Sequence, residues 1–193
     1  MIKELDVLKL PFYQWQLEDE IIDKVNSIVP SLDYFPNDYN FSTNYSCDLD
    51  FIVDEINYRL DELKEILYPN NNQFKIEVTE YWANKTDFSS QHHKHNHPNS
   101  LFSGIIYLTN HNKGGFTRFY YENLFYWHPF IVTLNQNKDL HFDVSPKKGM
   151  MIVFPSNIKH SVVPNRSRET RYTISFNTFF KGMIGENSYN LKI

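Results

Sequence analysis

Histidines gather in one short stretch of this chain. Four of the eight lie within six residues, at His92, His93, His95 and His97, and His160 lies far downstream. Side chains two residues apart on an extended chain point the same way, so alternate members of the cluster can reach one ion. A third imidazole from a distant strand would complete one face of an octahedron and leave positions open for substrate and O₂. The spacing therefore indicates a metal site.

The pattern also admits other interpretations. His93 and His95 form a second pair with the same spacing as His95 and His97. The cluster is also compatible with a solvated polar loop, or with a surface site that picks up zinc adventitiously.

A second polar pattern lies on the segment 171–177, RYTISFN. Arg, Thr, Ser and Asn alternate with Tyr, Ile and Phe, which is the pattern of a strand with one polar and one apolar face. A polar face inside a β-structure is costly unless it lines a site. Arg171 on that face could bind a carboxylate through two parallel hydrogen bonds.

Two helices precede the strands that must position these residues. Apolar residues recur every three or four positions over 17–29 and 50–67, which predicts a helix in each segment. Pro30 and Pro69 follow them and end them. We expect a short strand at 8–13 and a loop over 31–49.

After residue 72 the apolar period changes to that of strands, separated by Gly, Pro and Asn. The predicted strands span residues 74–82, 101–108, 116–121, 124–134, 140–144, 150–154, 158–163 and 171–180. Two helices followed by short strands predict an α+β fold, with the helices against the outside of a β-sandwich or barrel. The length suits a single domain over 1–193, with helical support at 1–72 and a β-structured core at 73–180.

The composition excludes several classes of protein. One cysteine, Cys47, rules out a disulfide within the chain and favours an intracellular protein. The net charge is −4 without a long basic run, so no nucleic-acid partner is evident. We find neither a signal peptide nor an apolar run long enough to cross a bilayer. We therefore expect a soluble, cytoplasmic protein with no membrane partner.

Three stretches resemble the iron(II)/2-oxoglutarate oxygenases, and look closest to a small bacterial and phage group related to prolyl hydroxylases. They are HNHPNSLFSGIIYL at 95–108, GGFTRF at 114–119, and GMMIVFPS at 149–156 with His160 and the strand 171–177. The resemblance covers roughly 74–180. It implies a double-stranded β-helix, a jelly-roll or cupin-like barrel, with Fe(II) and 2-oxoglutarate as cofactors.

The resemblance also implies roles for single residues. His95 matches the first iron ligand and His160 the distal one. Arg171 matches the residue that pairs with the far carboxylate of 2-oxoglutarate, and Tyr107 and Thr173 match supporting hydroxyls. The implied reaction consumes O₂ and 2-oxoglutarate, releases succinate and CO₂, and hydroxylates a protein or peptide side chain such as proline.

The chain departs from the family at one position. The usual motif is His-x-Asp or His-x-Glu, and here His97 stands in place of the acid. The expected ligands are therefore His95, His97 and His160, with His97 either on the metal or one shell away from it. Losing the carboxylate removes a negative charge and changes the metal preference.

Two alternative functions share the fold. A cupin-type metalloprotein would not use 2-oxoglutarate, but it usually has a Glu shortly after its paired histidines, and it has no need of Arg171. A catalytically silent binding module would have no reason to keep His95, His160 and Arg171 together.

The prime substrate is not readable from the sequence, because fold and cofactor do not fix it. The segment 122–144 is our candidate substrate-facing element, with a bulky edge strand as the alternative, and Asn84 and Arg118 are further candidates to face the pocket. Five aromatic residues near the motifs are candidates for an apolar wall, or for ordinary core packing: Trp82, Phe102, Phe119, Phe154 and Phe176.

Overall fold

The computed structural model describes residues 11–37, 40–43, 49–120, 141–185 and 191–193. Both predicted helices are present, as α1 (Asp19–Ile28) and α2 (Asp50–Leu67). Pro30 lies in a short 3-10 turn, Val29–Ser31, that ends α1. Neither helix is long and apolar enough to cross a membrane. The predicted strand 124–134 and most of the segment 122–144 lie outside the described residues.

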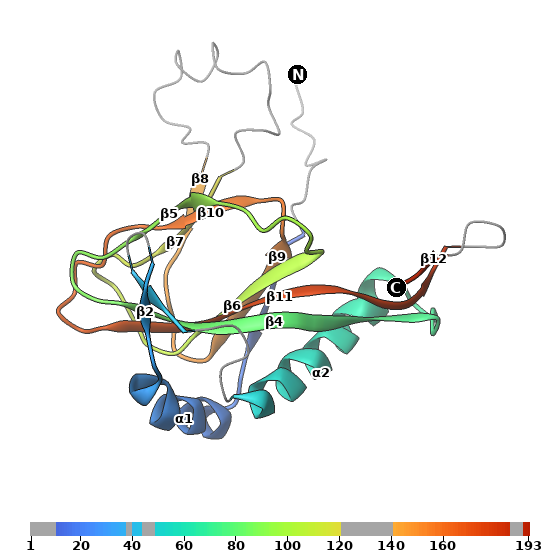
Figure 1. Ribbon diagram of the computed structural model, residues 1–193, viewed down its shortest axis with the longest axis horizontal. Coiled ribbons are helices and arrows are strands. Elements are labelled where there is room, and N and C mark those ends of the chain that lie inside the picture. Colours follow the sequence, from blue (N-terminus) through green and yellow to red (C-terminus); the bar gives the residue numbers. More distant parts are fainter. Residues whose placement is uncertain (1–10, 38–39, 44–48, 121–140, 186–190) are drawn as a thin grey trace, which may run out of the picture.

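The larger sheet carries eight strands in the order β1-β9-β6-β11-β4-β3-β2, with β12 paired to β11. All the pairings are antiparallel. Its strands are β1 (Tyr13–Gln16), β2 (Phe35–Pro36), β3 (Phe41–Ser42), β4 (Phe74–Thr86), β6 (Phe102–Tyr107), β9 (Met150–Pro155), β11 (Arg171–Ile184) and β12 (Leu191–Lys192). Figure 1 shows both helices on one side of this sheet, outside the β-structure, as expected.

The smaller sheet faces the other side of the large one (Figure 1). It is antiparallel with the order β5-β10-β7-β8, and its strands are β5 (His92–His95), β7 (Thr117–Tyr120), β8 (His141–Val144) and β10 (Lys159–Val162). The two sheets form the two layers of a jelly roll that is not closed into a continuous barrel.

Alternation along the large sheet produces two separate cores. Ile174 and Phe176 point toward the helices and join a cluster with residues of α1 and α2, such as Ile22 and Ile56. Tyr107 and its alternating neighbours point the other way, into the space between the sheets. That second cluster consists of Ile105, Tyr107, Phe119, Met150, Ile152 and Phe154.

Gly104 shows how tightly the first core is packed. Phe176 lies across the sheet from it in the pairing of β11 with β6. A Cβ atom at position 104 would overlap the Phe176 ring. A glycine is therefore needed there for close approach, not for an unusual backbone angle.

Two sequence expectations need correction. The predicted strand 8–13 lies partly outside the described residues, and the first described strand, Tyr13–Gln16, pairs with β9 through Tyr13 and Val153. The predicted loop 31–49 contains the β2–β3 hairpin, whose two-residue strands are too short to show a period. Finally, β11 runs to Ile184, past the predicted end at 180, because β4 extends beside it.

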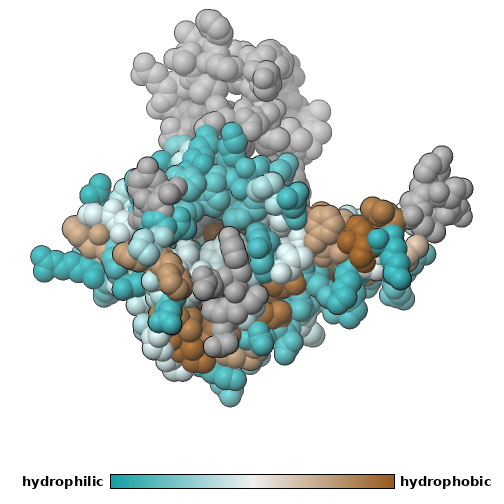
Figure 2. All heavy atoms as spheres, in the orientation of Figure 1, coloured by the Kyte–Doolittle hydropathy of each residue, from teal (hydrophilic) through white to brown (hydrophobic). Residues whose placement is uncertain are grey.

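Hydrophilic and hydrophobic side chains gather on different parts of the surface. In Figure 2, hydrophilic residues cover the small-sheet side, whereas hydrophobic residues gather near β12 and the end of β11. The exposed hydrophobic residues of the described chain include Ile66, Tyr68, Leu191 and Ile193.

Candidate metal and cosubstrate site

The histidine cluster forms an edge strand of the small sheet. β5 consists of His92–His95 and pairs with β10, where His160 lies opposite His95 and Val162 lies opposite His92. Three residue steps on β5 therefore match two on β10, which is a β-bulge. A bulge breaks strict alternation and re-aims side chains. As a result His92 and His93 both face the pocket that His95 and His97 line.

His95, His97 and His160 come together as the spacing suggests. One nitrogen from each ring lies within 4.8 Å of the others. The ring centroids of His95 and His160 are 4.4 Å apart, and those of His97 and His160 are 5.2 Å apart. His160 is buried, and the other two are partly exposed. We call these three residues the inner trio.

Backbone carbonyls fix two of the rings. Nδ1 of His95 lies 2.8 Å from the carbonyl oxygen of His93, and Nδ1 of His160 lies 3.1 Å from that of Ile158. A carbonyl oxygen can only accept a hydrogen bond, so each Nδ1 carries the proton. Each Nε2 is then left with a free lone pair, which is the state that binds a metal.

His97 is held differently, through Asn177. The side-chain nitrogen Nδ2 of Asn177 lies 3.3 Å from Nδ1 of His97 and also donates to Oε1 of Glu80 at 2.5 Å. The amide oxygen accepts a hydrogen bond from Ser103 at 2.7 Å. Because the Glu80 carboxylate requires a donor, the amide nitrogen must face it, and Nδ1 of His97 must accept. In this arrangement the proton of a neutral His97 is on Nε2.

Burial keeps these imidazoles neutral. It lowers the pKa of His97 to about 4 and that of His92 to about 3, in both cases with a further contribution from His95. Burial also lowers the pKa of His160 well below its usual value, and that of His95 to a lesser extent. A metal ion binds neutral imidazole, so proton competition is weak here at neutral pH.

Arg171 lies in the same pocket and is buried, with 2% of its surface exposed. Its Nη2 donates to Oγ1 of Thr117 at 3.3 Å, whereas its Nε has no hydrogen-bond partner in the described chain. No salt bridge to a described acid accompanies it. Burial lowers the pKa of Arg171 to about 10, so the guanidinium stays charged at neutral pH.

Tyr107 and Thr173 were both expected beside Arg171. The Tyr107 hydroxyl donates to Oγ1 of Thr117 at 2.7 Å, and the Arg171 guanidinium lies 5.5 Å from the centre of the Tyr107 ring. Burial raises the pKa of Tyr107 to about 12. Thr173 is buried and lines the pocket itself. Thr117, which joins Arg171 to Tyr107, was not singled out from the sequence.

A glycine leaves space for Arg171. Gly115 has a φ of +66°, and a Cβ there would lie 3.1 Å from Cδ of Arg171. Gly115, in the GGFTRF stretch, is therefore explained by its left-handed backbone and its close approach to Arg171.

The pocket between the sheets has a volume of about 400 Å³. Its lining includes Asn84, as suggested, together with Asn37, Asn40 and Ser42 of the β2–β3 hairpin, which we call the hairpin rim. Asn84 accepts a hydrogen bond from Ser42 at 2.9 Å and donates one to Ser175 at 2.9 Å. The sequence does not reveal the hairpin rim, because strands of two residues are too short to distinguish a hairpin from a loop.

Other suggested residues lie elsewhere. Arg118 pairs with Asp143 on the neighbouring strand, through bonds of 2.7 and 2.8 Å, and does not line the pocket. Of the five aromatic candidates, Trp82 lines the pocket. Phe119 and Phe154 contact the His160 ring, while Phe102 and Phe176 belong to the core beneath the helices.

Comparison with known proteins decides the family. The sequence model of a family of 2OG-Fe(II) oxygenases matches residues 80–177, which is about half of the chain. The match includes all of the site except the hairpin rim. The chain belongs to this family. Fe(II) and 2-oxoglutarate are the cofactors of these oxygenases. No curated protein matches the chain by sequence.

Solved structures agree on the fold. A 2OG-Fe(II) oxygenase family oxidoreductase from Burkholderia pseudomallei has a TM-score of 0.64 at 13% identity, covering 86% of this chain and 83% of that one. A Pseudomonas putida prolyl-4-hydroxylase has a TM-score of 0.59 at 14% identity, covering 87% and 92%. HygX from Streptomyces hygroscopicus, solved with nickel and 2-oxoglutarate, has a TM-score of 0.64 at 10% identity, covering 88% and 82%. The 2OG oxygenase double-stranded β-helix is therefore the fold of this chain.

The side chains present fit both cofactors. Imidazole nitrogens suit iron, and three of them converge in one pocket. The buried guanidinium, whose Nε has no partner among the described residues, suits a carboxylate at the same pocket. The one departure is chemical, since the inner trio is neutral where a His-x-Asp motif would contribute a negative charge.

Proposed function

We propose that this chain is a 2-oxoglutarate-dependent dioxygenase that hydroxylates a neutral side chain of a protein or peptide, such as proline. In this proposal the whole chain works as one oxygenase domain. His95, His97 and His160 hold Fe(II), and Arg171, supported by Tyr107 and Thr173, holds the far carboxylate of 2-oxoglutarate. When bound, the two cofactors supply the oxidation, using O₂ and releasing succinate and CO₂.

One observation carries the cosubstrate assignment. A buried positive charge without an acidic partner is costly, by several kcal/mol for an isolated ion. Arg171 is such a group within the described chain, and it shares a pocket with the inner trio. A dicarboxylate that reaches from the imidazoles to the guanidinium would compensate that charge. A cupin that does not use 2-oxoglutarate has no use for this arrangement.

The protein's own residues then have distinct tasks. The backbone carbonyls behind His95 and His160 keep their rings in the metal-binding tautomer. Thr117 accepts hydrogen bonds from Tyr107 and Arg171, so the guanidinium is oriented before a carboxylate arrives. Phe119 and Phe154 cover one side of His160 and exclude water from it.

The rim of the pocket supports a neutral substrate. Its described lining contains amides, hydroxyls and imidazoles, with Arg171 as the permanently charged residue and no carboxylate. The Asn40 side chain is buried, and its Oδ1 has no hydrogen-bond partner in the described chain. An acceptor left unpaired in the pocket lining suits a substrate that carries an N–H or O–H donor, as a peptide backbone does.

The cofactor assignment is tested by anaerobic titration of the metal-free protein with Fe(II) and 2-oxoglutarate. We expect a visible metal-to-ligand charge-transfer band that requires both additions. His160→Ala should abolish it, and Arg171→Ala should shift it to much higher 2-oxoglutarate concentration. Arg118→Ala, which alters a surface ion pair, is the matched control and should leave the band unchanged.

The possible outcomes are distinguishable. Iron binding without the band would favour a cupin-type metalloprotein, and no iron binding would favour a silent binding module. The substrate is tested separately, by mass spectrometry of proline-containing peptides after aerobic turnover. A gain of one oxygen with a matching yield of succinate is expected. Succinate formation without any modified peptide would reject the peptide-substrate proposal.

A further inference from the structure

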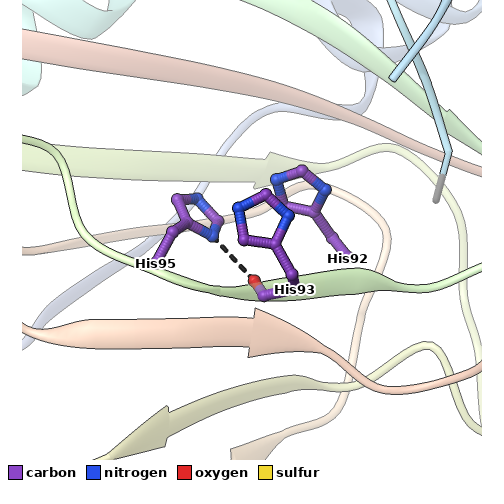
Figure 3. A group of neighbouring side chains, drawn as sticks. All are labelled: His92, His93 and His95. Carbon is purple, nitrogen blue, oxygen red and sulfur yellow. Dashed lines mark hydrogen bonds between the residues drawn. The ribbon is translucent and has the colours of Figure 1, made fainter. Parts of the chain in front are cut away.

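His92 and His93 lie beside the inner trio without belonging to it. Together with His95 they form a second group whose ligand atoms all lie within 4.8 Å of one another. The ring centroids of His92 and His95 are 4.6 Å apart, and those of His93 and His95 are 5.2 Å apart. Figure 3 shows the three side chains rising from the same side of β5. We call them the outer trio.

The bulge in β5 creates this grouping. On a regular strand, His92 would point away from His93 and His95. The extra residue in β5 relative to β10 brings His92 onto the pocket side, so two consecutive histidines line the pocket. Lys94, between them and His95, lies over the Tyr120 ring at 4.1 Å and does not line the pocket. β5 thus directs imidazoles toward the cavity, and the ammonium group of Lys94 away from it.

The two trios differ in exposure and share one ring. His93 is exposed, His92 and His95 are half-buried, and His160 is buried, so the histidines run from solvent to the interior. Nδ1 of His95 is engaged with the His93 carbonyl, as the dashed line in Figure 3 marks. His95 therefore offers one ligand nitrogen, and one ion at a time can use it. Nδ1 of His92 is buried and unpartnered in the described chain.

We propose that His92, His93 and His95 form a second metal site, which captures a divalent ion from solvent and passes it to the inner trio through the shared His95. Imidazole nitrogen is a good ligand for divalent ions such as Fe(II), Co(II), Ni(II) and Zn(II), so the outer trio suits ions of this class. The inner trio holds the ion more tightly, because His97 and His160 are more deeply buried than His93, and the Ile158 carbonyl fixes the His160 ring in the metal-binding tautomer.

The experiment uses Co(II) as the probe, with untagged full-length protein, no 2-oxoglutarate, and detection by visible absorption. The wild type should bind one Co(II). His97→Ala/His160→Ala should still bind one Co(II), more weakly, and adding His92→Ala and His93→Ala to it should abolish binding. Binding that survives all four substitutions would mean an adventitious ion only. A folded inner-trio variant that binds nothing would overturn the proposal.

A rate measurement does not depend on variants of buried residues. His92→Ala/His93→Ala alters exposed and half-buried side chains and leaves the inner trio intact. In stopped-flow mixing it should bind one Co(II) with unchanged final affinity but several-fold slower association. Lys94→Ala is the matched control on the same strand and should associate at the wild-type rate. An unchanged rate in the His92→Ala/His93→Ala protein would overturn the capture role.

The capture proposal rests on the inner trio only for the hand-over step. If the charge-transfer band with 2-oxoglutarate does not form, the proposed oxygenase cofactor site is rejected. Co(II) binding at the outer trio is tested independently, by the histidine variants above.

Discussion

His160 lies directly opposite His95 in the pairing of β10 with β5, and each ring has its Nδ1 turned to the backbone carbonyl two residues earlier in the chain. The two strands thus present equivalent imidazoles to the same point. His97 follows β5 and faces Asn177 of the large sheet instead. The site therefore combines two rings positioned by backbone with one positioned by a side chain.

This difference predicts two kinds of tautomer. In the metal-free protein above pH 7, His95 and His160 should carry the proton on Nδ1, and His97 should carry it on Nε2. Long-range ¹⁵N–¹H correlation spectra of histidine-labelled protein distinguish the two forms. Single His→Asn variants would assign the signals. Finding all three rings in the same form would contradict the role given to Asn177.

Glu80 should therefore lower the affinity of the site for a metal ion on His97. A metal on Nε2 displaces the proton to Nδ1, where it faces the amide nitrogen of Asn177, and the amide cannot turn while Glu80 accepts from it. In Glu80→Gln the new amide can pair with either orientation of Asn177. We expect metal affinity to rise by about five-fold, the worth of roughly one neutral hydrogen bond. Competition for Co(II) against a chelating dye measures it.

The control for this change is Glu77→Gln, on the same strand, which alters a surface ion pair with Lys181. It should leave metal affinity unchanged. A weaker affinity in Glu80→Gln would instead mean that the carboxylate supports the bound metal through Asn177.

Arg171→Met should weaken the binding of 2-oxoglutarate without lowering the stability of the metal-free protein. Charge-assisted hydrogen bonds contribute about 1.5–3 kcal/mol, so 2-oxoglutarate affinity should fall by at least about ten-fold while Co(II) affinity is retained. The metal-free variant should be at least as stable as the wild type, because it no longer buries an unpaired charge. Thermal melts with and without metal and 2-oxoglutarate measure both effects. A large loss of stability in the metal-free variant would show that the guanidinium is already compensated.

The sequence predicted the parts of the site that lie on regular strands. Alternation along 171–177 places Arg171 and Thr173 on one face, and the structure has them on the pocket side. The bulge that turns His92 inward leaves no mark on the apolar pattern, because every residue of β5 is polar. Thr117 and Asn177 gain their importance from partners on distant strands, and a single sequence does not reveal such cross-strand neighbours.

Gly104→Ala should destabilise the fold without touching the pocket. The added methyl group would overlap the Phe176 ring, which is fully buried beneath the helices and has no space to retreat. Overpacking of this kind costs about 1–3 kcal/mol. Chemical denaturation should show a lower midpoint with an unchanged slope. Gly104→Ala/Phe176→Leu should recover part of the loss, and no recovery would mean that the cost has another origin.

The metal-free protein should lose stability as the pH falls below about 6.5, the usual pKa of histidine in an unfolded chain. Burial lowers the pKa of His97 to about 4 and that of His92 to about 3 in the folded state, and lowers that of His160 as well. Between pH 6.5 and 4 the unfolded chain therefore binds protons that the folded protein does not, and this favours unfolding. Well above pH 6.5 the rings are neutral in both states and contribute no pH dependence. Melting temperatures in the presence of a chelator should thus fall from pH 6.5 to pH 4, and less steeply in His160→Leu, which has one such ring fewer. A wild type whose melting temperature stays constant down to pH 4.5 would show that the site histidines take up protons while folded, and that the pocket is open to water.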